Sequence, residues 1–276
     1  MNRRGFVAGA LATGLGGTLQ LRAQDNGASG LSPGLQLYTI RQLMQDDVPS
    51  ALALVADVGY RHVEFAGYFD HPAGELRLML DDMGLTAPAA HVPLEAMSAS
   101  PDAAIESALT LGHRYLVVPW LAPESRATLD GYYRLAEQLN AFGEACDRAG
   151  LRFAYHNHDF EFELTDGGVP YDVLLDETDP ALVEFELDLY WIRAAARSEL
   201  EYFERYPGRF TLWHVKDMDT RGEMADVGDG VIDFAALFGR ADTGVRYAFV
   251  ERDDSPDPES TIRRSHAALA RMLNRA

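Results

Sequence analysis

Short apolar segments and longer amphipathic segments alternate along this chain from Leu35 onward. The short segments are typical of buried strands, and the longer ones carry apolar residues at the three- and four-residue spacings of helices. Gly59, Gly84, Gly112 and Gly150 each stand between a helical segment and a strand, where a left-handed residue commonly ends a helix. The pattern therefore predicts repeated strand-helix units.

Eight such units can be counted. The expected strands are residues 35–38, 62–65, 87–92, 115–118, 152–156, 183–188, 210–214 and 246–251. The expected helices are residues 50–58, 74–83, 101–111, 125–148, 171–177, 194–206, 234–238 and 260–273. Eight units in a chain of 276 residues predict an α/β protein with a closed parallel (β/α)8 TIM barrel. An open doubly wound sheet is the alternative, but the first turns lack the glycine-rich phosphate loop expected of that fold.

The N-terminus has the composition of an export signal. Arg3 and Arg4 precede a small and apolar stretch over residues 8–21, which predicts a twin-arginine signal peptide over residues 1–24. This stretch is too short for a membrane span, so we expect no stable membrane insertion after the signal is removed. Residues 25–276 are then expected to form a single TIM-barrel domain that works in the periplasm or outside the cell.

The charge of the chain limits its partners. The formal net charge is −19, and removal of Arg3, Arg4 and Arg22 with the signal leaves 21 basic against 43 acidic residues, or −22. Affinity for nucleic acid comes largely from basic side chains, so we expect no nucleic-acid partner. The same field favours a neutral small-molecule carbohydrate or polyol over a sugar phosphate. The long helix at residues 125–148 permits a homo-oligomer without requiring one.

Ionisable residues gather at the predicted carboxyl ends of the strands. They are Glu64, His91, His156, His158, Asp188, His214, Lys216 and Glu251. Barrel interiors are normally filled with branched apolar side chains, so ionisable groups there are costly unless they bind something. Imidazoles and carboxylates together suit a divalent cation, whereas a network of buried salt bridges closing the barrel is the alternative.

Lys216 is the only lysine of the chain. A lysine is a compact point charge on a thin stem, whereas arginine carries a wide planar fork, so a site that places one charge near a ligand distinguishes the two. In an extended segment His214 and Lys216 point to the same side. A lysine left over from an arginine-biased composition is the alternative. The aromatic residues near strand ends, Tyr38, Trp120 and Trp191, are expected to stack on a sugar or to seal the rim of the barrel.

Five motifs carry a family resemblance. They are residues 155–162 (YHNHDFEF), 187–191 (LDLYW), 214–217 (HVKD), 227–234 (VGDGVIDF) and 250–253 (VERD). In this order, and with the opening residues 35–41, they resemble the xylose isomerase-like barrel superfamily of sugar isomerases and epimerases, which also contains inosose dehydratase. The resemblance spans nearly all of the predicted mature chain.

The resemblance implies a divalent ion, Mn²⁺ first and Zn²⁺, Mg²⁺ or Co²⁺ as alternatives, held by Glu, Asp, His and a second Glu from the last four strands. Asp188, His214 and Glu251 match the last three ligands. The usual first glutamate falls at His156, which we expect to bind in its place. Glu161 could instead fold back to the ion, and His158 is either a rival ligand or a substrate contact.

The implied function is a metal-dependent sugar isomerase or epimerase that works through an enediolate. Epimerases of the superfamily use two opposed glutamates, and one of these is replaced here, so a lyase, a dehydratase or a 3-keto-glycoside hydrolase is an alternative. A non-catalytic periplasmic sugar-binding barrel is a further alternative. The catalytic candidates are Lys216, His158, Glu251 and His156. The candidate substrate contacts are Tyr38, Glu64, His91, Trp120, Trp191 and Glu161.

Overall fold

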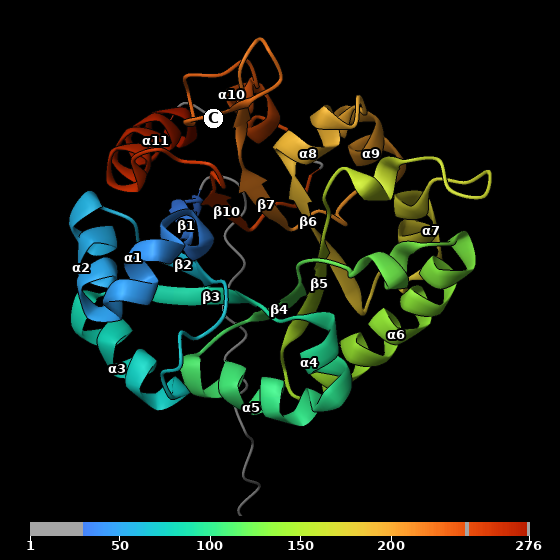
Figure 1. The fold of residues 1–276 in the computed structure, drawn as a ribbon, viewed down its shortest axis with the longest axis horizontal. Helices are drawn as coiled ribbons and strands as arrows, with labels where there is room; N and C mark the ends of the chain where they lie inside the picture. Colours follow the sequence, from blue (N-terminus) through green and yellow to red (C-terminus); the bar gives the residue numbers. More distant parts are fainter. Residues whose placement is uncertain (1–29, 241–242, 275–276) are drawn as a thin grey trace, which may run out of the picture.

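The computed structural model describes residues 30–240 and 243–274, so the signal peptide predicted for residues 1–24 lies outside the described residues. In the described part of the chain, eight parallel strands close into a barrel with helices around it (Figure 1). The strands are β1 (Pro33–Gln36), β2 (His62–Phe65), β3 (Thr86–His91), β4 (Tyr115–Val118), β5 (Arg152–His156), β6 (Val183–Asp188), β7 (Leu212–Val215) and β10 (Tyr247–Val250). The predicted TIM barrel is confirmed.

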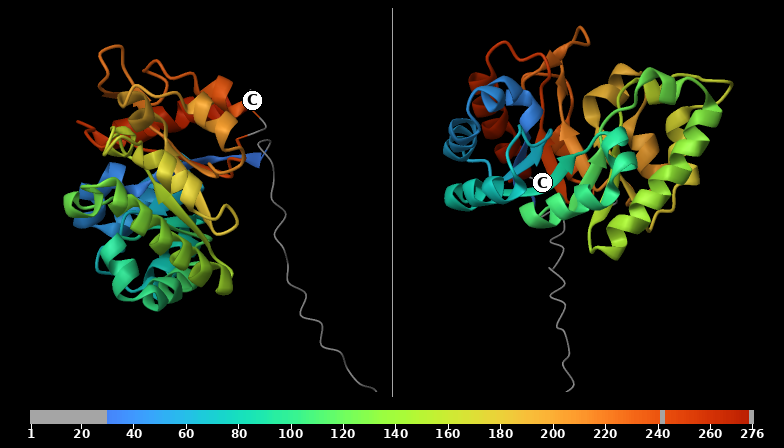
Figure 2. Two further views of the ribbon diagram at one scale, coloured as in Figure 1. Left: turned by 90° about the vertical axis from the view of Figure 1, so that its right-hand side faces the viewer. Right: turned by 60° about the horizontal axis from the view of Figure 1, so that its bottom comes forward.

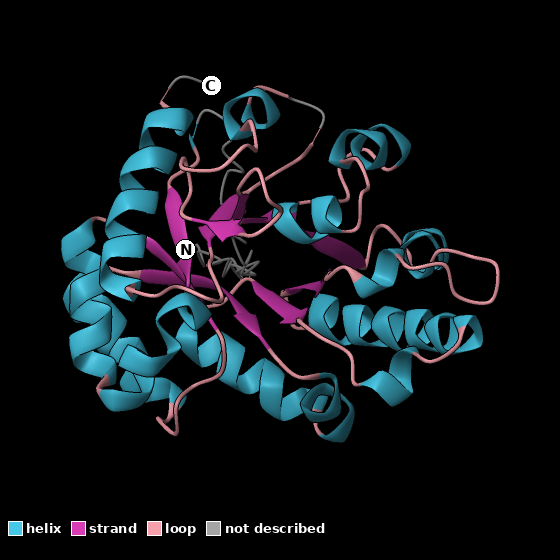
Figure 3. Cartoon of the chain, turned by 45° about the horizontal axis from the view of Figure 1, so that its top comes forward, coloured by secondary structure: helices cyan, strands magenta, loops and turns pink. Residues whose placement is uncertain are grey.

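Each strand pairs with its neighbour in the chain, and β10 closes the barrel against β1. The helices that follow the strands form the outer layer, as the secondary-structure view of Figure 3 shows. They are α1 (Arg41–Asp46), α2 (Val48–Val58), α3 (Ala73–Met83), α4 (Leu94–Ala99), α5 (Pro101–Leu111), α6 (Leu129–Arg148), α7 (Pro170–Glu177), α8 (Leu189–Ala194), α9 (Glu199–Arg205), α10 (Phe234–Phe238) and α11 (Pro258–Leu273). The long helix α6 runs along the outside of the barrel beside α7 (Figure 2).

Several predicted elements have other bounds, such as α6, which begins at Leu129 and not at residue 125, and two of the differences have a clear local reason. The first strand was expected over residues 35–38, but β1 ends at Gln36, whose side chain accepts a hydrogen bond from the backbone N–H of Tyr38. This turn starts a 3₁₀ helix at Leu37–Ile40. The helix expected over residues 194–206 is instead α8 and α9, which are separated near Ala196, where φ is +55°.

The interior of the barrel is layered. Side chains alternate along a strand, so every second residue points inward. A buried apolar cluster fills part of the interior: Ala89, Tyr115, Val117, Ala154, Leu212 and Phe249. On β6 the inward-facing series includes Glu186 and Asp188, whose register partners are Leu212 and His214 of β7. The change from apolar to ionisable side chains therefore occurs along the strands, toward their carboxyl ends.

Candidate metal centre and active site

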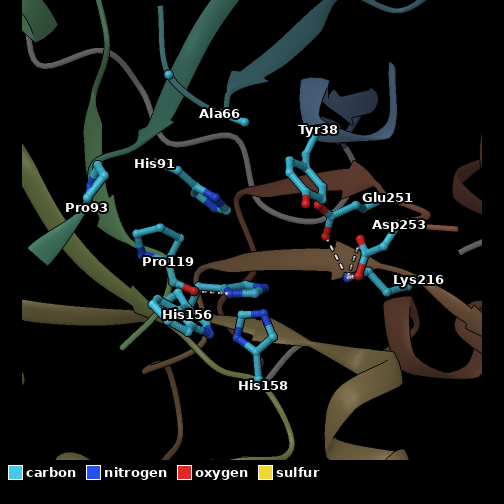
Figure 4. A pocket seen from close by; sticks show the side chains of 12 residues that line it. Tyr38, Ala66, His91, Pro93, Pro119, His156, His158, Lys216, Glu251 and Asp253 are labelled. Carbon is cyan, nitrogen blue, oxygen red and sulfur yellow. Dashed lines mark hydrogen bonds and ion pairs between the residues drawn. The ribbon is translucent and has the colours of Figure 1, made fainter. Parts of the chain in front are cut away.

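The carboxyl ends of the strands surround a cavity of about 490 Å³. Figure 4 shows three imidazoles, those of His91, His156 and His158, on one side of this cavity. On the other side Lys216 contacts two carboxylates that also line it. Residues far apart in the sequence thus meet at one end of the barrel, as enzymes of this architecture require.

Four of the predicted residues form what we call the mouth cluster: His156, Asp188, His214 and Glu251. One donor atom from each lies within 4.8 Å of the donor atoms of the other three. Nδ1 of His214 is 2.8 Å from Oε2 of Glu251 and 3.8 Å from Oδ2 of Asp188. Nε2 of His156 is 3.5 Å from the same Asp188 oxygen. Donors around one tetrahedral Zn²⁺ lie roughly 3.4 Å apart, so these spacings fit a shared cation.

Neighbouring groups orient the side chains of the mouth cluster. Oδ1 of Asp188 accepts hydrogen bonds of 2.9 Å from the backbone N–H groups of Tyr190 and Trp191 and so caps α8. Nδ1 of His156 lies 3.1 Å from the carbonyl oxygen of Pro119, which can only accept, so this nitrogen carries the proton. These contacts leave Oδ2 of Asp188 and Nε2 of His156 free to face the cluster.

Three buried donor atoms of the mouth cluster make no hydrogen bond, although charged groups lie near two of them: Oδ2 of Asp188, Nε2 of His156 and Nδ1 of His214. Buried polar atoms are nearly always hydrogen-bonded, so three that converge on one point need an explanation. Two imidazole nitrogens and two carboxylates form a donor set that a divalent cation accepts. The residues present therefore fit a divalent cation.

The close packing of charges shifts the pKa values in the mouth cluster. Burial would raise the pKa of the Asp188 and Glu251 carboxyls, but the Lys216 ammonium and the neighbouring imidazoles together outweigh burial and lower both pKa values. Burial and the His214 imidazole lower the pKa of His156. Burial would also lower the pKa of His214, but the Glu186 and Glu251 carboxylates outweigh it and raise this pKa well above its ordinary value.

Lys216 lies among three carboxylates. Its Nζ is 3.0 Å from Oδ2 of Asp188, 2.8 Å from Oε2 of Glu251 and 3.1 Å from Oδ1 of Asp253. Burial would lower the pKa of Lys216, but these carboxylates outweigh burial and raise it well above its ordinary value. The ammonium is therefore a fixed positive charge and hydrogen-bond donor at the cavity wall.

A second group of possible metal ligands shares His214 with the mouth cluster, and we call it the inner cluster. Its members are Glu64, His91, Glu186 and His214. Nε2 of His214 is 2.8 Å from Oε2 of Glu64 and 3.2 Å from Oε2 of Glu186. Nε2 of His91 is 2.9 Å from the same Glu186 oxygen. Burial and the Glu186 carboxylate raise the pKa of Glu64 to about 7. Burial would raise the pKa of Glu186 as well, but the His214 and His91 imidazoles together outweigh burial and lower this pKa.

The structure does not bring every candidate substrate contact to the cavity. Glu64 is fully buried behind His214 and also accepts a hydrogen bond from the side chain of Gln36. Glu161 faces away, because its carboxyl accepts hydrogen bonds from the Tyr155 hydroxyl at 2.5 Å and from the backbone N–H of His158 at 2.8 Å. Glu161 is thus held in the wall of the barrel, apart from the mouth cluster.

His158 lines the cavity beside the mouth cluster, with its ring centroid 4.9 Å from that of His156. Burial and the neighbouring His156 imidazole lower the pKa of His158 to about 2, so the ring is neutral. Its Nδ1 is buried without a hydrogen-bond partner. This position places His158 next to the donor set but outside it.

The aromatic candidates occupy two kinds of position. Tyr38 and Trp120 line the cavity and remain 42% and 46% exposed, so their ring faces are open to a ligand. Trp191 packs instead behind the wall, with its ring centroid 5.5 Å from the His158 ring and 5.5 Å from Nζ of Lys216. Tyr38 and Trp120 can stack on a ligand, whereas Trp191 supports two residues that contact the cavity.

Two residues of this region were not singled out from the sequence. Glu186 lies two residues before Asp188 on β6, and the alternation that turns Asp188 inward also turns Glu186 inward. Asp253 lies beyond the last strand and reaches the cavity through its contact with Lys216. Burial and the Glu251 carboxylate raise the pKa of Asp253 to about 6. The motif VERD at residues 250–253 contained Asp253, but nothing in its spacing gave the direction of this side chain.

The chain belongs to the xylose isomerase-like TIM barrel family, whose family model matches residues 52–272. Among curated proteins it is similar to the inosose dehydratase of Geobacillus kaustophilus (strain HTA426), with 23% identity over 71% of this chain and 79% of the relative. The sequence resemblance to this family is therefore confirmed.

Solved structures agree with this assignment. A sugar phosphate isomerase/epimerase from Parabacteroides distasonis ATCC 8503 superposes with a TM-score of 0.74 and 26% identity, covering 90% of this chain and 95% of the other. The IOLI protein, solved with a zinc atom, has a TM-score of 0.69 and 15% identity, covering 88% of this chain and 98% of the other. At that identity the second likeness shows the fold alone. None of the helices in the described residues has the length and apolar character of a membrane span.

Proposed function

We propose that this chain is an enzyme that requires a divalent cation, Mn²⁺ or a similar ion, and isomerises or epimerises a neutral sugar or keto-sugar. The observation that carries the proposal is the mouth cluster. Its buried donor atoms, three of them without a hydrogen bond, converge at the wall of a cavity that also presents a buried ammonium and exposed aromatic rings. The names of the similar proteins, isomerase/epimerase and dehydratase, fit the same chemistry.

His156, Asp188, His214 and Glu251 would hold the cation. When bound there, the cation would polarise a substrate carbonyl and a neighbouring hydroxyl, which makes the adjacent C–H bond acidic. Lys216, charged and directed at the cavity, would donate a hydrogen bond to the substrate oxygen on which negative charge develops. The chain would thus stabilise an enediolate from two sides.

A base must take the proton from carbon. Asp253 lines the cavity and its pKa of about 6 is close to neutrality, which suits a group that accepts and returns a proton. His158 is neutral and adjacent, but its pKa of about 2 makes it a weak base, so we assign it to a hydrogen bond with the substrate. Glu251, with its pKa lowered, is better suited to binding the cation than to carrying the proton.

The charges of the cavity favour a neutral substrate. The fixed cation among its lining residues is Lys216, and three carboxylates already surround that ammonium. A phosphate group would meet these carboxylates without a free arginine among the described lining residues. The faces of Tyr38 and Trp120 are suited to the C–H faces of a sugar ring.

One observation favours a second candidate, a lyase or dehydratase. Imidazoles occupy one side of the cavity, where a second carboxylate would be needed for proton transfer on both faces of a sugar. A single base that removes a proton, followed by loss of a leaving group from the next carbon, needs no second carboxylate. Loss of water would make the enzyme a dehydratase, and loss of an alcohol would cleave a keto-glycoside.

The experiment that tests the proposal follows protons at carbon. Neutral keto-sugars, keto-inositols, 3-keto-glycosides and phosphorylated sugars are each incubated with the protein and Mn²⁺ in heavy water, and deuterium at each carbon is read by NMR. The proposal expects deuterium next to the carbonyl of one substrate class, at a rate that chelator abolishes. Asp188→Asn should abolish it too, whereas Asp229→Asn, which removes an exposed carboxylate, should not.

The outcomes separate the candidates. Deuterium with retention of all substituents supports isomerisation or epimerisation, and release of water or alcohol supports the lyase. Exchange confined to phosphorylated sugars would contradict the neutral substrate class. Tight binding of a sugar without exchange would contradict catalysis and leave a sugar-binding barrel.

We also propose that the chain is exported by the twin-arginine route. The sequence of residues 1–24 supports this proposal. Expression with and without Arg3→Lys, Arg4→Lys tests it: the parent should appear in the periplasmic fraction, and the double variant should remain inside the cell. Equal partition of the two proteins would contradict the proposal.

A further inference from the structure

His214 belongs to both clusters, one through each ring nitrogen. Nδ1 faces the mouth cluster, 2.8 Å from Oε2 of Glu251. Nε2 faces the inner cluster, 2.8 Å from Oε2 of Glu64 and 3.2 Å from Oε2 of Glu186. The inner cluster therefore cannot be treated as a separate part of the core, because it shares this imidazole with the proposed cation site.

The donor geometry of the inner cluster resembles that of the mouth cluster. One donor atom from each of Glu64, His91, Glu186 and His214 lies within 4.8 Å of the others. The four nitrogen-to-oxygen distances between the two imidazoles and the two carboxylates are 2.8, 3.2, 2.9 and 3.5 Å. These values are close to the roughly 3.4 Å that separates donors around one tetrahedral ion.

Both carboxylates of the inner cluster have an oxygen without a partner. Glu64 and Glu186 are fully buried, and Oε1 of each has no hydrogen bond in the described part of the chain. A hydrogen-bond network that served only to orient His214 would need one carboxylate, and both oxygens of that carboxylate would have hydrogen-bond partners. In each carboxylate Oε2 faces the imidazoles and Oε1 has no partner, and a further positive charge beside the two groups would account for this arrangement.

The charge of the whole region leads to the same requirement. The two clusters and Asp253 bring together five carboxylates and one ammonium, that of Lys216, and the ammonium contacts three of the carboxylates: Asp188, Glu251 and Asp253. One divalent cation in the mouth cluster balances Asp188 and Glu251. The carboxylates of the inner cluster then remain with imidazoles as their ion-pair partners. Once a cation binds Nδ1 of His214, this imidazole is neutral and no longer offsets the charge of the two carboxylates, whereas a second divalent cation would balance both.

We propose that the inner cluster is a second divalent-cation site, formed by Glu64, His91, Glu186 and Nε2 of His214. His214 then bridges two cations as an imidazolate, and its Nε2 proton leaves to solvent when the second ion binds. Two imidazole nitrogens and two carboxylate oxygens suit Zn²⁺, Co²⁺ or Mn²⁺. His91 lines the cavity, so an ion can reach the inner cluster from the mouth.

The inference goes beyond the proposed function and depends on it only through the shared His214. Two variants separate the sites. Glu186→Gln removes a donor of the inner cluster alone, and Asp188→Asn removes a donor of the mouth cluster alone. His91→Asn is a second inner-cluster variant, in case Glu186→Gln does not fold. Asp229→Asn, an exposed substitution, is the matched control.

The test counts ions. Protein stripped with chelator is dialysed against Co²⁺ or Zn²⁺, and bound metal is measured by elemental analysis. We expect two equivalents for the parent and for Asp229→Asn, and one equivalent for each inner-cluster variant and for Asp188→Asn. Calorimetry in two buffers of different ionisation enthalpy should show that the second equivalent releases at least one proton.

Other counts overturn the inference. One equivalent in the parent that survives Glu186→Gln and is lost in Asp188→Asn would show the mouth site alone. No bound metal would overturn both the second site and the cation of the proposed function. One equivalent that survives Asp188→Asn and is lost in Glu186→Gln would retain the inner site and overturn the mouth site.

Discussion

Replacement of Glu161 by glutamine should stabilise the folded protein, by an amount that grows with pH. The carboxyl of Glu161 is buried between the Tyr155 hydroxyl and the backbone N–H of His158. Burial raises the pKa of Glu161 from 4.5 to about 8, and the hydrogen bonds offset this only in part. The folded chain therefore keeps this carboxyl neutral at pH 7, whereas the unfolded chain ionises it.

The sign and size of the effect follow from proton linkage. Because the pKa of Glu161 is raised on folding, the folded state binds one more proton than the unfolded state between pH 4.5 and about 8. Stability therefore falls as pH rises through this window. Each pH unit corresponds to about 1.4 kcal/mol, so the full loss is roughly 5 kcal/mol, and the loss from pH 5 to pH 7 is about 2.5 kcal/mol.

Glutamine should escape this loss. It is neutral at every pH, and its carbonyl can accept the His158 N–H while its amide donates to the Tyr155 oxygen. Urea unfolding of the parent, Glu161→Gln and the control Glu163→Gln, which changes an exposed carboxylate on the same loop, gives the free energies of unfolding. The advantage of Glu161→Gln over the parent should grow by about 2.5 kcal/mol from pH 5 to pH 7, and that of Glu163→Gln should not.

An advantage that is independent of pH, or that shrinks as pH rises, would refute the reasoning. It would mean that Glu161 is ionised in the folded chain. The carboxylate would then be available to bind a cation, and Glu161 would return as a candidate for the first ligand in place of His156.

Three further predictions address the cavity and the core. Lys216→Arg should keep the fold and the bound cation but lower kcat on the order of 100-fold, because the arginine fork cannot place its charge where the ammonium lies. If steady-state kinetics show that turnover is retained, Lys216 does not stabilise the developing negative charge on the substrate. Trp120→Ala should raise KM about fivefold with little change in kcat, since an exposed stacking face is worth about 1 kcal/mol, and an unchanged KM would exclude stacking. Burial lowers the pKa of His113 to about 4, so the unfolded state binds more protons than the folded state below pH 6.5, and stability falls as pH falls. His113→Gln should lack the resulting loss of about 2 kcal/mol between pH 7 and pH 5. If urea unfolding shows that the free energy of unfolding of the parent and of His113→Gln changes equally between these pH values, the prediction is wrong.

The parts of the fold and site that follow strand periodicity could be predicted. The strands at residues 62–65, 115–118, 152–156 and 183–188 occur where the sequence predicts them. Because parallel strands deliver their carboxyl ends to one face, residues separated by many positions, such as His156 and Glu251, could be expected to meet. The same periodicity could have identified Glu186, which shares an inward face with Asp188.

Residues beyond the strand ends could not be placed in this way. Tyr38 leaves the strand because the side chain of Gln36 starts a turn, and Glu161 turns away because Tyr155 and the backbone of His158 satisfy it. Asp253 lines the cavity with its carboxylate against Lys216. These directions depend on contacts between loops, which no local period encodes.

Anomalous diffraction from crystals of the cation-loaded protein is the most direct test of the central claim. Data collected on both sides of the absorption edge of Mn, Co or Zn locate each bound ion without reference to activity. We expect a peak at the mouth cluster, within about 2.3 Å of Nε2 of His156, Oδ2 of Asp188, Nδ1 of His214 and a carboxylate oxygen of Glu251. A map without a peak there, or with the ion on His158 or Glu161 instead, would contradict it.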